Sequence, residues 1–323
     1  MINNFTKYAT GWVRYGNVFA YPHDWQEPAK TELWAYEKQL ETPSNDIYTQ
    51  YICFPWATLV DYLNHNPAKA RQLLMALDNR PPRFALNVKT FCQHISALKL
   101  LPFFKKIGIT EIYWSHKVKE QDEVEGIKLR PYPLYPVMHY KRQRPYKNKP
   151  LSERKYLYSF IGSYQPGLYL TKIREWIFNL PDNPEAYIKK RTEWHFEQDV
   201  YRNQLLGMSE SEAKKRSRIE DESEYVHVME ESIFCLCPSG SGPNSIRLWE
   251  ALDFGCIPVI ISDTYDDSLL KNRAHIKIPE DQASLVATIS TLNRAMLSNS
   301  KFDSKIGFIS SPRSSVGNES SIP

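Results

Sequence analysis

The feature that most constrains the fold is the segment from Ser232 to Asp263, SIFCLCPSGSGPNSIRLWEALDFGCIPVIISD. It begins and ends with continuous apolar runs of buried-strand length, at residues 233–237 and 256–261. Between these runs, a loop of serines and glycines leads into a helical pattern at residues 243–254, which Gly255 ends. The segment therefore predicts a β–α–β unit, and with it an α/β fold.

Strand-like and helical patterns alternate elsewhere in the chain as well. Helices are expected at residues 67–77, 95–107 and 168–180, and strands at residues 84–88, 109–114 and 156–161. The charged stretch 189–224 contains pieces that fit either type. Because strands that alternate with helices usually pair in parallel, we expect parallel sheets.

The length of 323 residues predicts two domains. We place the boundary in the basic, proline-containing stretch 141–153, which has almost no apolar residues. An N-terminal α/β domain is therefore expected at residues 1–150 and a C-terminal one at residues 151–297, both of which the resemblance given below implies to be Rossmann-like. Residues 298–323 form a Ser-rich tail with few large apolar groups, a composition that predicts disorder.

Composition and charge argue against several classes of protein. A net charge of +4 is small for this length and gives no reason to expect a nucleic-acid partner, although residues 141–149 and 214–218 are basic clusters. The sequence shows neither an apolar stretch long enough to span a membrane nor a signal peptide, and its five cysteines fit reduced thiols. The expected compartment is the cytoplasm.

The loop Ser239-Gly240-Ser241-Gly242 follows a predicted buried strand and precedes a helix. At such a place, free backbone N–H groups and the positive end of the helix dipole suit a phosphate. The glycines allow close approach of the backbone, and the serines add hydroxyl donors. The loop has no Walker A lysine, and Ser245 replaces the third glycine of the dinucleotide fingerprint. Small loops before helices are common, so a purely structural turn is the alternative.

The helix after the loop adds an argument for an anion. Leu248, Trp249 and Leu252 form the predicted buried stripe, whereas Arg247 and Glu250 lie together on the opposite side. A cation in the first turn of a helix is unfavourable by about 0.3–1 kcal/mol, so an anion is expected near Arg247. Either Glu250 supplies it through a surface salt bridge, or a bound diphosphate does, because guanidinium matches phosphate oxygens.

The run CPSGSGPNSIRLWEAL, followed by GCIPVIISD, resembles the donor-binding region of the exostosin-like glycosyltransferases. The similarity extends to YLYSFIGS at residues 156–163 and, more loosely, to residues 90–116. The resemblance implies a GT-B fold, in which two Rossmann-like domains face each other across a cleft. It also implies inverting transfer of a sugar from a nucleotide-sugar donor, most often a UDP-sugar, to a glycan or lipid-linked glycan, with no cofactor and no metal.

The resemblance further implies which residues bind the donor. The diphosphate would be wrapped by the loop that contains Ser239, Gly240, Ser241, Gly242, Asn244 and Ser245, while Arg247 neutralises it and Glu250 holds the ribose. Gly162 is a further expected donor-binding residue. Animal members of the family are anchored in a membrane at the N-terminus, and no such anchor is readable here. The Ser-rich tail also differs from the usual closing helix. The expected location is therefore cytoplasmic, with peripheral association at the inner face of a membrane.

An inverting transfer needs a base near the acceptor hydroxyl, and facing-domain folds usually supply it from the N-terminal half. His94 and His116 each follow a predicted strand, so both are expected at carboxyl strand ends that face the cleft. Each histidine could instead be structural or contact the acceptor. Glu111, Asp122 and Glu123 are the fallback carboxylates.

Other functions fit parts of the sequence. A fucosyltransferase-like enzyme that uses GDP-fucose has a similar donor region, with a Glu-bearing helix followed by a G-x-I-P-V strand. A non-catalytic module on the same fold could hold an acidic glycan or a nucleic acid with the basic stretch 141–149. The acids of DTYDD at residues 263–267 argue only weakly for a metal-dependent D-x-D site, because such sites belong to a single-domain architecture. Cys235 and Cys237 predict a buried pair rather than a zinc site.

Overall fold

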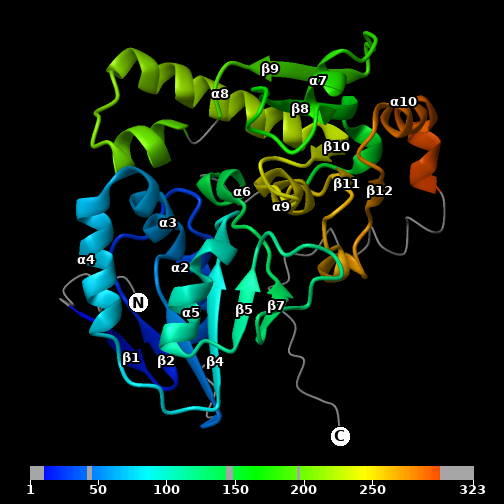
Figure 1. Cartoon of the computed structure of the whole chain (residues 1–323). Coiled ribbons are helices and arrows are strands. Elements are labelled where there is room, and N and C mark those ends of the chain that lie inside the picture. The colour runs from blue at the N-terminus through cyan, green and yellow to red at the C-terminus, as the bar shows by residue number, and fades with distance from the viewer. Residues whose placement is uncertain (1–10, 42–45, 143–147, 195–196, 299–323) are drawn as a thin grey trace, which may run out of the picture.

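The computed structural model describes residues 11–41, 46–142, 148–194 and 197–298. In this part of the chain, two β-sheets are flanked by helices (Figure 1). The first sheet has seven strands in the order β1-β2-β3-β4-β5-β7-β6, and the second has five in the order β12-β11-β10-β8-β9. The predicted mixed α/β class with parallel-rich sheets is therefore confirmed.

The first sheet is formed by the N-terminal half of the chain. Its strands are β1 (Val13–Tyr15), β2 (Val18–Ala20), β3 (Thr49–Cys53), β4 (Asn87–Cys92), β5 (Glu111–Trp114), β6 (Glu123–Val124) and β7 (Ile127–Pro131). Only the edge strands β1 and β6 pair antiparallel with their neighbours. The accompanying helices are α2 (Thr31–Glu41), α3 (Trp56–His65), α4 (Pro67–Asp78), η1 (Ala97–Leu100) and α5 (Leu101–Ile107).

The second sheet is parallel throughout. Its strands are β8 (Tyr156–Ser163), β9 (Ala186–Arg191), β10 (Ser232–Pro238), β11 (Ile257–Ile261) and β12 (Ile276–Ile278). The other elements are α6 (Val137–Lys141), η2 (Leu151–Glu153), α7 (Ile173–Phe178), η3 (Glu197–Leu205), α8 (Glu212–Glu230), α9 (Ile246–Asp253), η4 (Ser268–Leu270), α10 (Gln282–Thr291) and η5 (Arg294–Ser298). Because all the strands run the same way, their carboxyl ends meet at one edge of the sheet.

The predicted β–α–β unit is present as β10, α9 and β11. Alternate residues of β10 point to opposite faces: Phe234 and Leu236 pack with α7 and α10, whereas Cys235 and Cys237 pack with α8 and α9. Both cysteines are buried and neither forms a disulfide, which confirms the prediction of two buried, reduced thiols. Gly255 ends the helix with a φ of +70°, a left-handed conformation that favours glycine.

Several predicted boundaries are wrong, among them those of one strand and three helices: the helix expected at residues 95–107 begins as η1 at Ala97 and continues as α5. The strand expected at residues 84–88 runs from Asn87 to Cys92, because the Arg83 side chain binds the carbonyl oxygens of Ala85 and Leu86. The helix expected at residues 243–254 begins only at Ile246, after an extended Ser245. The helix expected at residues 168–180 is the shorter α7.

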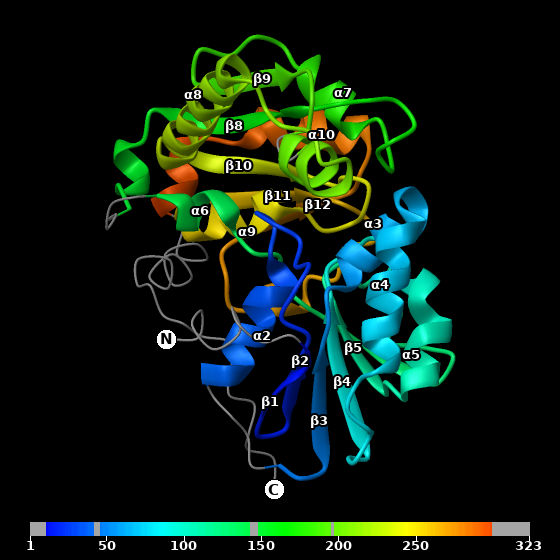
Figure 2. The same cartoon turned by 90° about the vertical axis from the view of Figure 1, so that its left-hand side faces the viewer.

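Figures 1 and 2 show the second sheet lying over the carboxyl ends of the strands of the first sheet. The loop after β5 is joined to the loop after β11 by an antiparallel bridge between Val118 and Tyr265. Beside it, the buried ammonium of Lys117 lies 2.6 Å from Asp266 and 2.9 Å from Asp122. The two halves therefore touch next to the loop that follows β10.

The predicted domain limits remain predictions, as does a cleft between the halves. The first sheet ends at Pro131 and the second begins at Tyr156, so the predicted boundary at residue 150 falls between them. However, α6 packs on α9, and η3 packs on α3 of the other half. Of the predicted tail, all but Ser298 lies outside the described residues.

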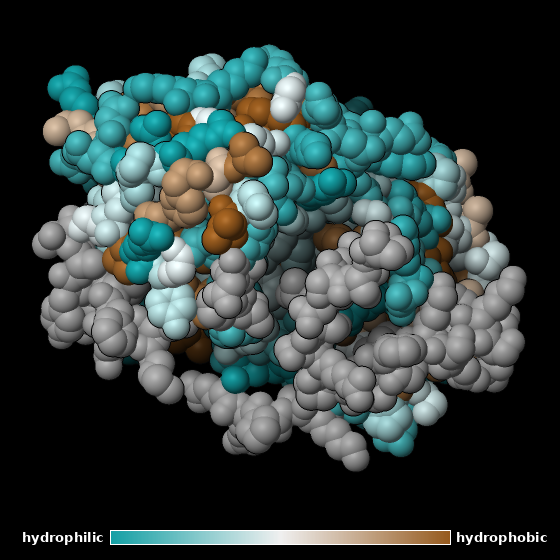
Figure 3. Space-filling view, turned by 90° about the horizontal axis from the view of Figure 1, so that it is seen from below, coloured by the Kyte–Doolittle hydropathy of each residue, from teal (hydrophilic) through white to brown (hydrophobic). Residues whose placement is uncertain are grey.

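The described surface is mostly hydrophilic when seen from below (Figure 3). Apolar side chains on this face are scattered. Among the exposed apolar side chains of the described residues, Leu86 is 69% exposed. Within the described ranges, no helix is both long enough and apolar enough to cross a membrane.

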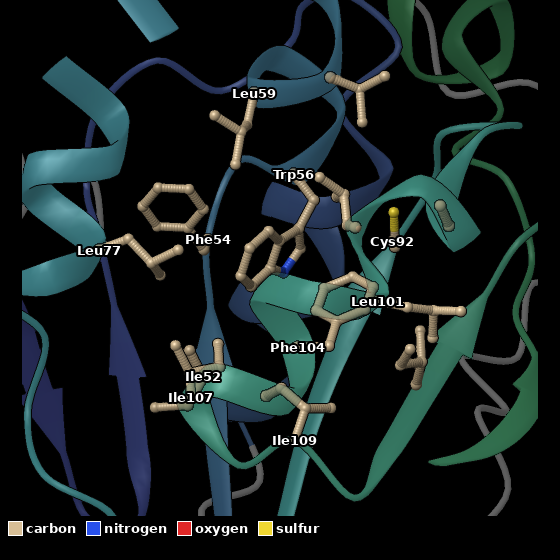
Figure 4. Close-up of a cluster of buried hydrophobic side chains, with 14 of the residues drawn as sticks. Ile52, Phe54, Trp56, Leu59, Leu77, Cys92, Leu101, Phe104, Ile107 and Ile109 are labelled. Atoms are coloured by element: carbon tan, nitrogen blue, oxygen red, sulfur yellow. The ribbon is translucent and has the colours of Figure 1, made fainter. Parts of the chain in front are cut away.

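The core of the N-terminal half forms where α3 and α5 cover the first sheet (Figure 4). The rings of Trp56 and Phe104 are both fully buried and meet edge to face with centroids 4.8 Å apart. The indole N–H of Trp56 donates to the Thr90 hydroxyl at 2.7 Å, so the ring satisfies its polar atom while packing its apolar body.

Replacement of Phe104 by alanine should lower the free energy of unfolding by about 3–5 kcal/mol, because it leaves a cavity beneath Trp56. Urea denaturation measures the change. The exposed Leu86→Ala variant is the control and should change stability by less than about 0.5 kcal/mol. Equal losses in the two variants would contradict this description of the core.

Candidate functional site

The loop from Ser239 to Ser245 lies at the carboxyl end of β10, as predicted. Ser239 is buried, and its backbone N–H donates to the carbonyl oxygen of Ile261 at 3.0 Å. Within the loop, the N–H of Gly240 donates to the carbonyl oxygen of Gly242 at 2.9 Å. The loop is therefore a folded turn anchored to β11, and it leads into the first turn of α9.

Gly162, near the end of β8, lies beside two arginines. A Cβ atom at this position would approach Arg247 Nη2 to 3.1 Å, the Phe160 ring to 3.2 Å and Arg174 Nη1 to 3.5 Å. A larger residue would push these side chains aside by a few tenths of an ångström, so glycine leaves the two guanidinium groups the most room here. The predicted site residue Gly162 and the predicted Arg247 are thus brought together, along with a cation that the sequence analysis did not single out.

Arg247 is partly covered rather than free in solvent. Its guanidinium lies over the Phe160 ring, 4.4 Å from the centroid, and Nη2 donates to the carbonyl oxygen of Ile161. Its Nε is buried and has no hydrogen-bond partner among the described residues. The hydroxyl of Ser245, also buried, is likewise without a partner in the described part of the chain. Two donors at the start of α9 thus have unused hydrogen-bonding capacity.

Arg174 is the second arginine and lies in the first turn of α7. Its Nε donates to the carbonyl oxygen of Ser239 and its Nη1 to that of Ser163, both at 3.1 Å. Its guanidinium lies 4.3 Å from the centroid of the Tyr169 ring. Burial and the neighbouring Arg247 guanidinium lower the pKa of Arg174 to about 10, so the group is still charged at neutral pH.

No Asp or Glu within the described ranges lies at ion-pair distance from either of these guanidinium groups. Two like charges held together in a poorly solvated place repel each other unless an anion neutralises them. Arginine binds phosphate oxygens through paired N–H donors. The arrangement of Arg174, Arg247 and the loop after β10 is therefore chemically suited to an anion such as a diphosphate.

The prediction that Glu250 faces outward with Arg247 is wrong. Glu250 is only 3% exposed, because α6 and α8 cover the side of α9 that faces away from the sheet. One carboxylate oxygen accepts from the backbone N–H of Met138 at 2.9 Å, and the other accepts from the Tyr225 hydroxyl at 2.7 Å. Burial raises the pKa of this carboxyl group. No salt bridge joins Glu250 to Arg247, and the proposed role of Glu250 in holding ribose stays a prediction.

Asn244 and Gly242 connect the loop to the N-terminal half. The Asn244 amide donates to the carbonyl oxygen of Ser115 at 2.7 Å, and its oxygen accepts from the Trp249 indole at 3.0 Å. A Cβ atom at Gly242 would come within 2.5 Å of His116 Nδ1, so only glycine fits against this imidazole. These residues hold the loop in place, and Gly240 and Ser241 stay half-buried beside it.

The structure gives the two predicted histidines different surroundings. His94 accepts a hydrogen bond from the Ser96 N–H on Nδ1 at 2.9 Å, and its Nε2 lies 3.3 Å from a carboxylate oxygen of Asp61. Both of its ring nitrogens are therefore occupied. His116 is 8% exposed, and its Nδ1 has no hydrogen-bond partner among the described residues. Burial, and secondarily His94, lower the pKa of His116 to about 3.

The fallback carboxylates lie away from the loop or in ion pairs. Glu111 pairs with Arg130 at 2.8 Å, and Asp122 pairs with Lys117. Glu123 is exposed on the edge strand β6. Nothing in their geometry directs any of them toward the loop after β10.

The acids at residues 263–267 are spread over separate contacts. Asp263 accepts from the backbone N–H of Glu280 at 3.0 Å, Asp266 pairs with Lys117, and Asp267 pairs with Lys277 at 3.2 Å. Within the described ranges, no three His, Cys, Asp or Glu side chains are grouped so that they could hold a metal ion.

Arg174 could have been found from the sequence by the argument that singled out Arg247. Both arginines are the second residue of a helix that follows a parallel strand, and in both cases the cation faces the unfavourable end of the helix dipole. The helix predicted at residues 168–180 placed Arg174 in its second turn, where this argument does not apply.

The fold is that of an α/β protein, and its candidate anion site lies at the carboxyl ends of parallel strands, where nucleotide-binding proteins of this class bind their ligands. A family model described as the exostosin GT47 domain matches residues 96–291, which contain His116, Arg174 and the whole loop after β10. The match covers more than half of the chain. The protein belongs to the exostosin GT47 family of glycosyltransferases.

Its sequence relatives include named plant enzymes. It is 44% identical over 71 residues to a probable glucuronosyltransferase of Oryza sativa subsp. japonica, and 62% identical over 39 residues to the probable beta-1,4-xylosyltransferase IRX10 of Arabidopsis thaliana. These segments make up 21% and 12% of this chain, and 17% and 10% of the two relatives. The chain therefore aligns with less than a fifth of the length of each of these two plant proteins.

The buried His116 should make stability depend on pH. In the folded protein its imidazole stays neutral down to about pH 3, whereas in the unfolded chain it binds a proton below about pH 6.5. Between these limits the unfolded chain binds more protons, so stability falls as the pH falls, by up to about 1.4 kcal/mol per pH unit.

The His116→Asn variant removes this contribution and should lose stability less steeply than the wild type between pH 6.5 and pH 4.5. Urea denaturation at three pH values measures the two slopes. The other buried groups titrate alike in both proteins, so the difference isolates His116. Parallel slopes would show that His116 is protonated or exposed in the folded protein.

Proposed function

We propose that the protein is an inverting glycosyltransferase that moves a sugar from a nucleoside-diphosphate donor to a glycan acceptor. The observation that carries the proposal is the convergence of Arg174 and Arg247 at Gly162, with no carboxylate of the described residues at ion-pair distance from either. When the bond between the sugar and the diphosphate of the donor breaks, negative charge develops on the leaving diphosphate. Two fixed guanidinium groups in a poorly solvated site would stabilise that charge.

The donor is proposed to be a UDP-sugar. Support comes from the family and from the relatives, which are called a probable glucuronosyltransferase and a probable xylosyltransferase. UDP-glucuronic acid and UDP-xylose are therefore the first donors to test. The acceptor is proposed to be a glycan or lipid-linked glycan, met in the cytoplasm or at the inner face of a membrane. The proposed transfer uses no metal ion, so EDTA should leave turnover unchanged.

His116 is the better of the two proposed bases. It contacts the loop at Gly242 and keeps one ring nitrogen without a partner, whereas His94 has both nitrogens engaged. Its low pKa keeps the imidazole neutral at physiological pH, which is the form that accepts a proton. The same low pKa makes it a weak base, so its share of the rate enhancement should be modest.

The polyanion-binding alternative is less well supported. In the basic cluster at residues 214–218, Lys214 pairs with Glu193 at 3.4 Å and Arg218 pairs with Glu210 at 3.0 Å. In the stretch 141–149, Lys141 pairs with Glu222 and Lys149 with Glu231, both at 2.8 Å, while residues 143–147 lie outside the described residues. These four cations are already neutralised within the protein. The GDP-fucose alternative differs only in the donor base and is separated from the proposal by nucleotide preference.

Arg174→Ala and Arg247→Ala should each weaken binding of UDP by about 10–100-fold, because each removes charge-assisted hydrogen bonds worth about 1.5–3 kcal/mol. Isothermal titration of the wild type with UDP and GDP establishes the reference affinity. A preference for GDP would favour the fucosyltransferase-like alternative.

Arg294→Ala is the matched control. This arginine donates to the carbonyl oxygens of Arg154 and Lys155, which lie just before the amino end of β8, at the opposite edge of the same sheet. Its removal takes away one positive charge but should leave UDP affinity unchanged. If the wild type binds neither nucleotide, or if the three variants bind equally well, the proposed donor site is wrong.

A further inference from the structure

Glu280 lies between β12 and α10, just before Asp281, the N-cap of α10. Resting on the proposed function, we propose that the Glu280 carboxylate binds hydroxyl groups of the nucleotide-sugar donor, the part that the sequence analysis gave to Glu250. The juxtaposition that supports this is a carboxylate with an unused oxygen beside the anion site formed by Arg174 and Arg247.

Glu280 is held firmly at the carboxyl ends of three neighbouring strands. One of its carboxylate oxygens, Oε1, accepts hydrogen bonds from the Thr171 hydroxyl at 2.8 Å and from the Ser239 hydroxyl. Its backbone N–H donates to Asp263, the second residue beyond β11, at 3.0 Å. Three segments thus fix the position of this side chain, which is half-buried.

Ser239 links this carboxylate to the cationic side of the site. The hydroxyl of Ser239 donates to Glu280, and its carbonyl oxygen accepts from Arg174 Nε at 3.1 Å. No ion pair joins Arg174 and Glu280, so the two charges lie in one neighbourhood without neutralising each other directly. The site therefore has a positive part and a negative part in fixed relative positions.

The second carboxylate oxygen of Glu280, Oε2, has no hydrogen-bond partner among the described residues. An ionised carboxylate only accepts hydrogen bonds, so it attracts hydroxyl groups and repels phosphate. A ligand that fits both parts must carry an anionic group for the arginines and hydroxyl groups for Glu280. A nucleotide sugar has this polarity, and inorganic phosphate or pyrophosphate does not.

Glu250 is placed differently. It is only 3% exposed, and its two oxygens accept hydrogen bonds from the Met138 N–H and the Tyr225 hydroxyl. These contacts fasten α9 to α6 and α8. Of the two carboxylates, Glu280 is therefore the one that is half-buried and has an oxygen without a partner among the described residues.

Hydroxyl groups of the donor come from two sources, the ribose and the transferred sugar, and the experiment separates them. Glu280→Gln keeps the size of the side chain and removes its charge. The control Asp281→Asn removes a carboxylate one residue further on, which caps α10 by accepting from the Ser284 N–H at 2.8 Å. Isothermal titration measures the affinity of each protein for UDP, 2′,3′-dideoxy-UDP and UDP-xylose. Thermal unfolding checks that each protein is folded.

If Glu280 holds the ribose, Glu280→Gln should weaken the binding of UDP by about tenfold, because a hydrogen bond to a charged group is lost. The dideoxy nucleotide already lacks the ribose hydroxyl groups, so it should bind to the wild type and to the variant with equal affinity. If it holds the transferred sugar, Glu280→Gln should leave UDP unchanged and remove the extra affinity of UDP-xylose over UDP. Asp281→Asn should bind all three ligands as the wild type does.

Unchanged affinities in Glu280→Gln, alongside lost UDP binding in Arg174→Ala, would overturn the role of Glu280 and leave the proposed function standing. Failure of the wild type to bind any of the three ligands would overturn both. Should Glu280→Gln not fold, Thr171→Val takes its place. That variant removes one hydrogen bond that orients the carboxylate, and it should weaken the same ligand by a smaller factor.

Discussion

Two guanidinium groups meet at the one position in β8 that has no side chain. Each comes from the second residue of a helix, Arg174 in α7 and Arg247 in α9, and each helix follows a parallel strand of the same sheet. Their mutual repulsion is not offset by any carboxylate at ion-pair distance in the described chain. An anion bound there would stabilise the folded protein, by an amount that rises with the logarithm of its concentration relative to its dissociation constant.

The surrounding aromatic rings and backbone explain how such a pair is tolerated. The Phe160 ring lies under Arg247 and the Tyr169 ring under Arg174, so each cation has one favourable aromatic contact. Carbonyl oxygens of Ile161, Ser163 and Ser239 accept hydrogen bonds from the same groups. These partners fix the direction of the two arginine side chains but carry no net charge. The positive charge of the guanidinium groups therefore remains available to attract a ligand.

Local patterns in the sequence were enough to predict the β–α–β unit and the helix end at Gly255, because apolar runs and glycine conformation depend on near neighbours. They could not place Glu250, since periodicity identifies the face of α9 that packs on the sheet and says nothing of α6 and α8 on the other side. Arg174 was missed because the expected helix began too early. Glu280 had no local signal, because its importance depends on β12 lying beside β11.

The antiparallel bridge between Val118 and Tyr265 joins the two halves of the described chain by backbone pairing. Lys119 adds a backbone hydrogen bond to Thr264 at 2.9 Å, and the buried Lys117 adds an ion pair to Asp266. Thermal fluctuations that part the two sheets must break this backbone pairing and expose a buried charge, whereas contacts such as that from Asn244 to the Ser115 carbonyl oxygen depend on one side chain. The seam should therefore act as a pivot, so that a substitution in the loop after β5 would alter the loop after β10 without touching a ligand.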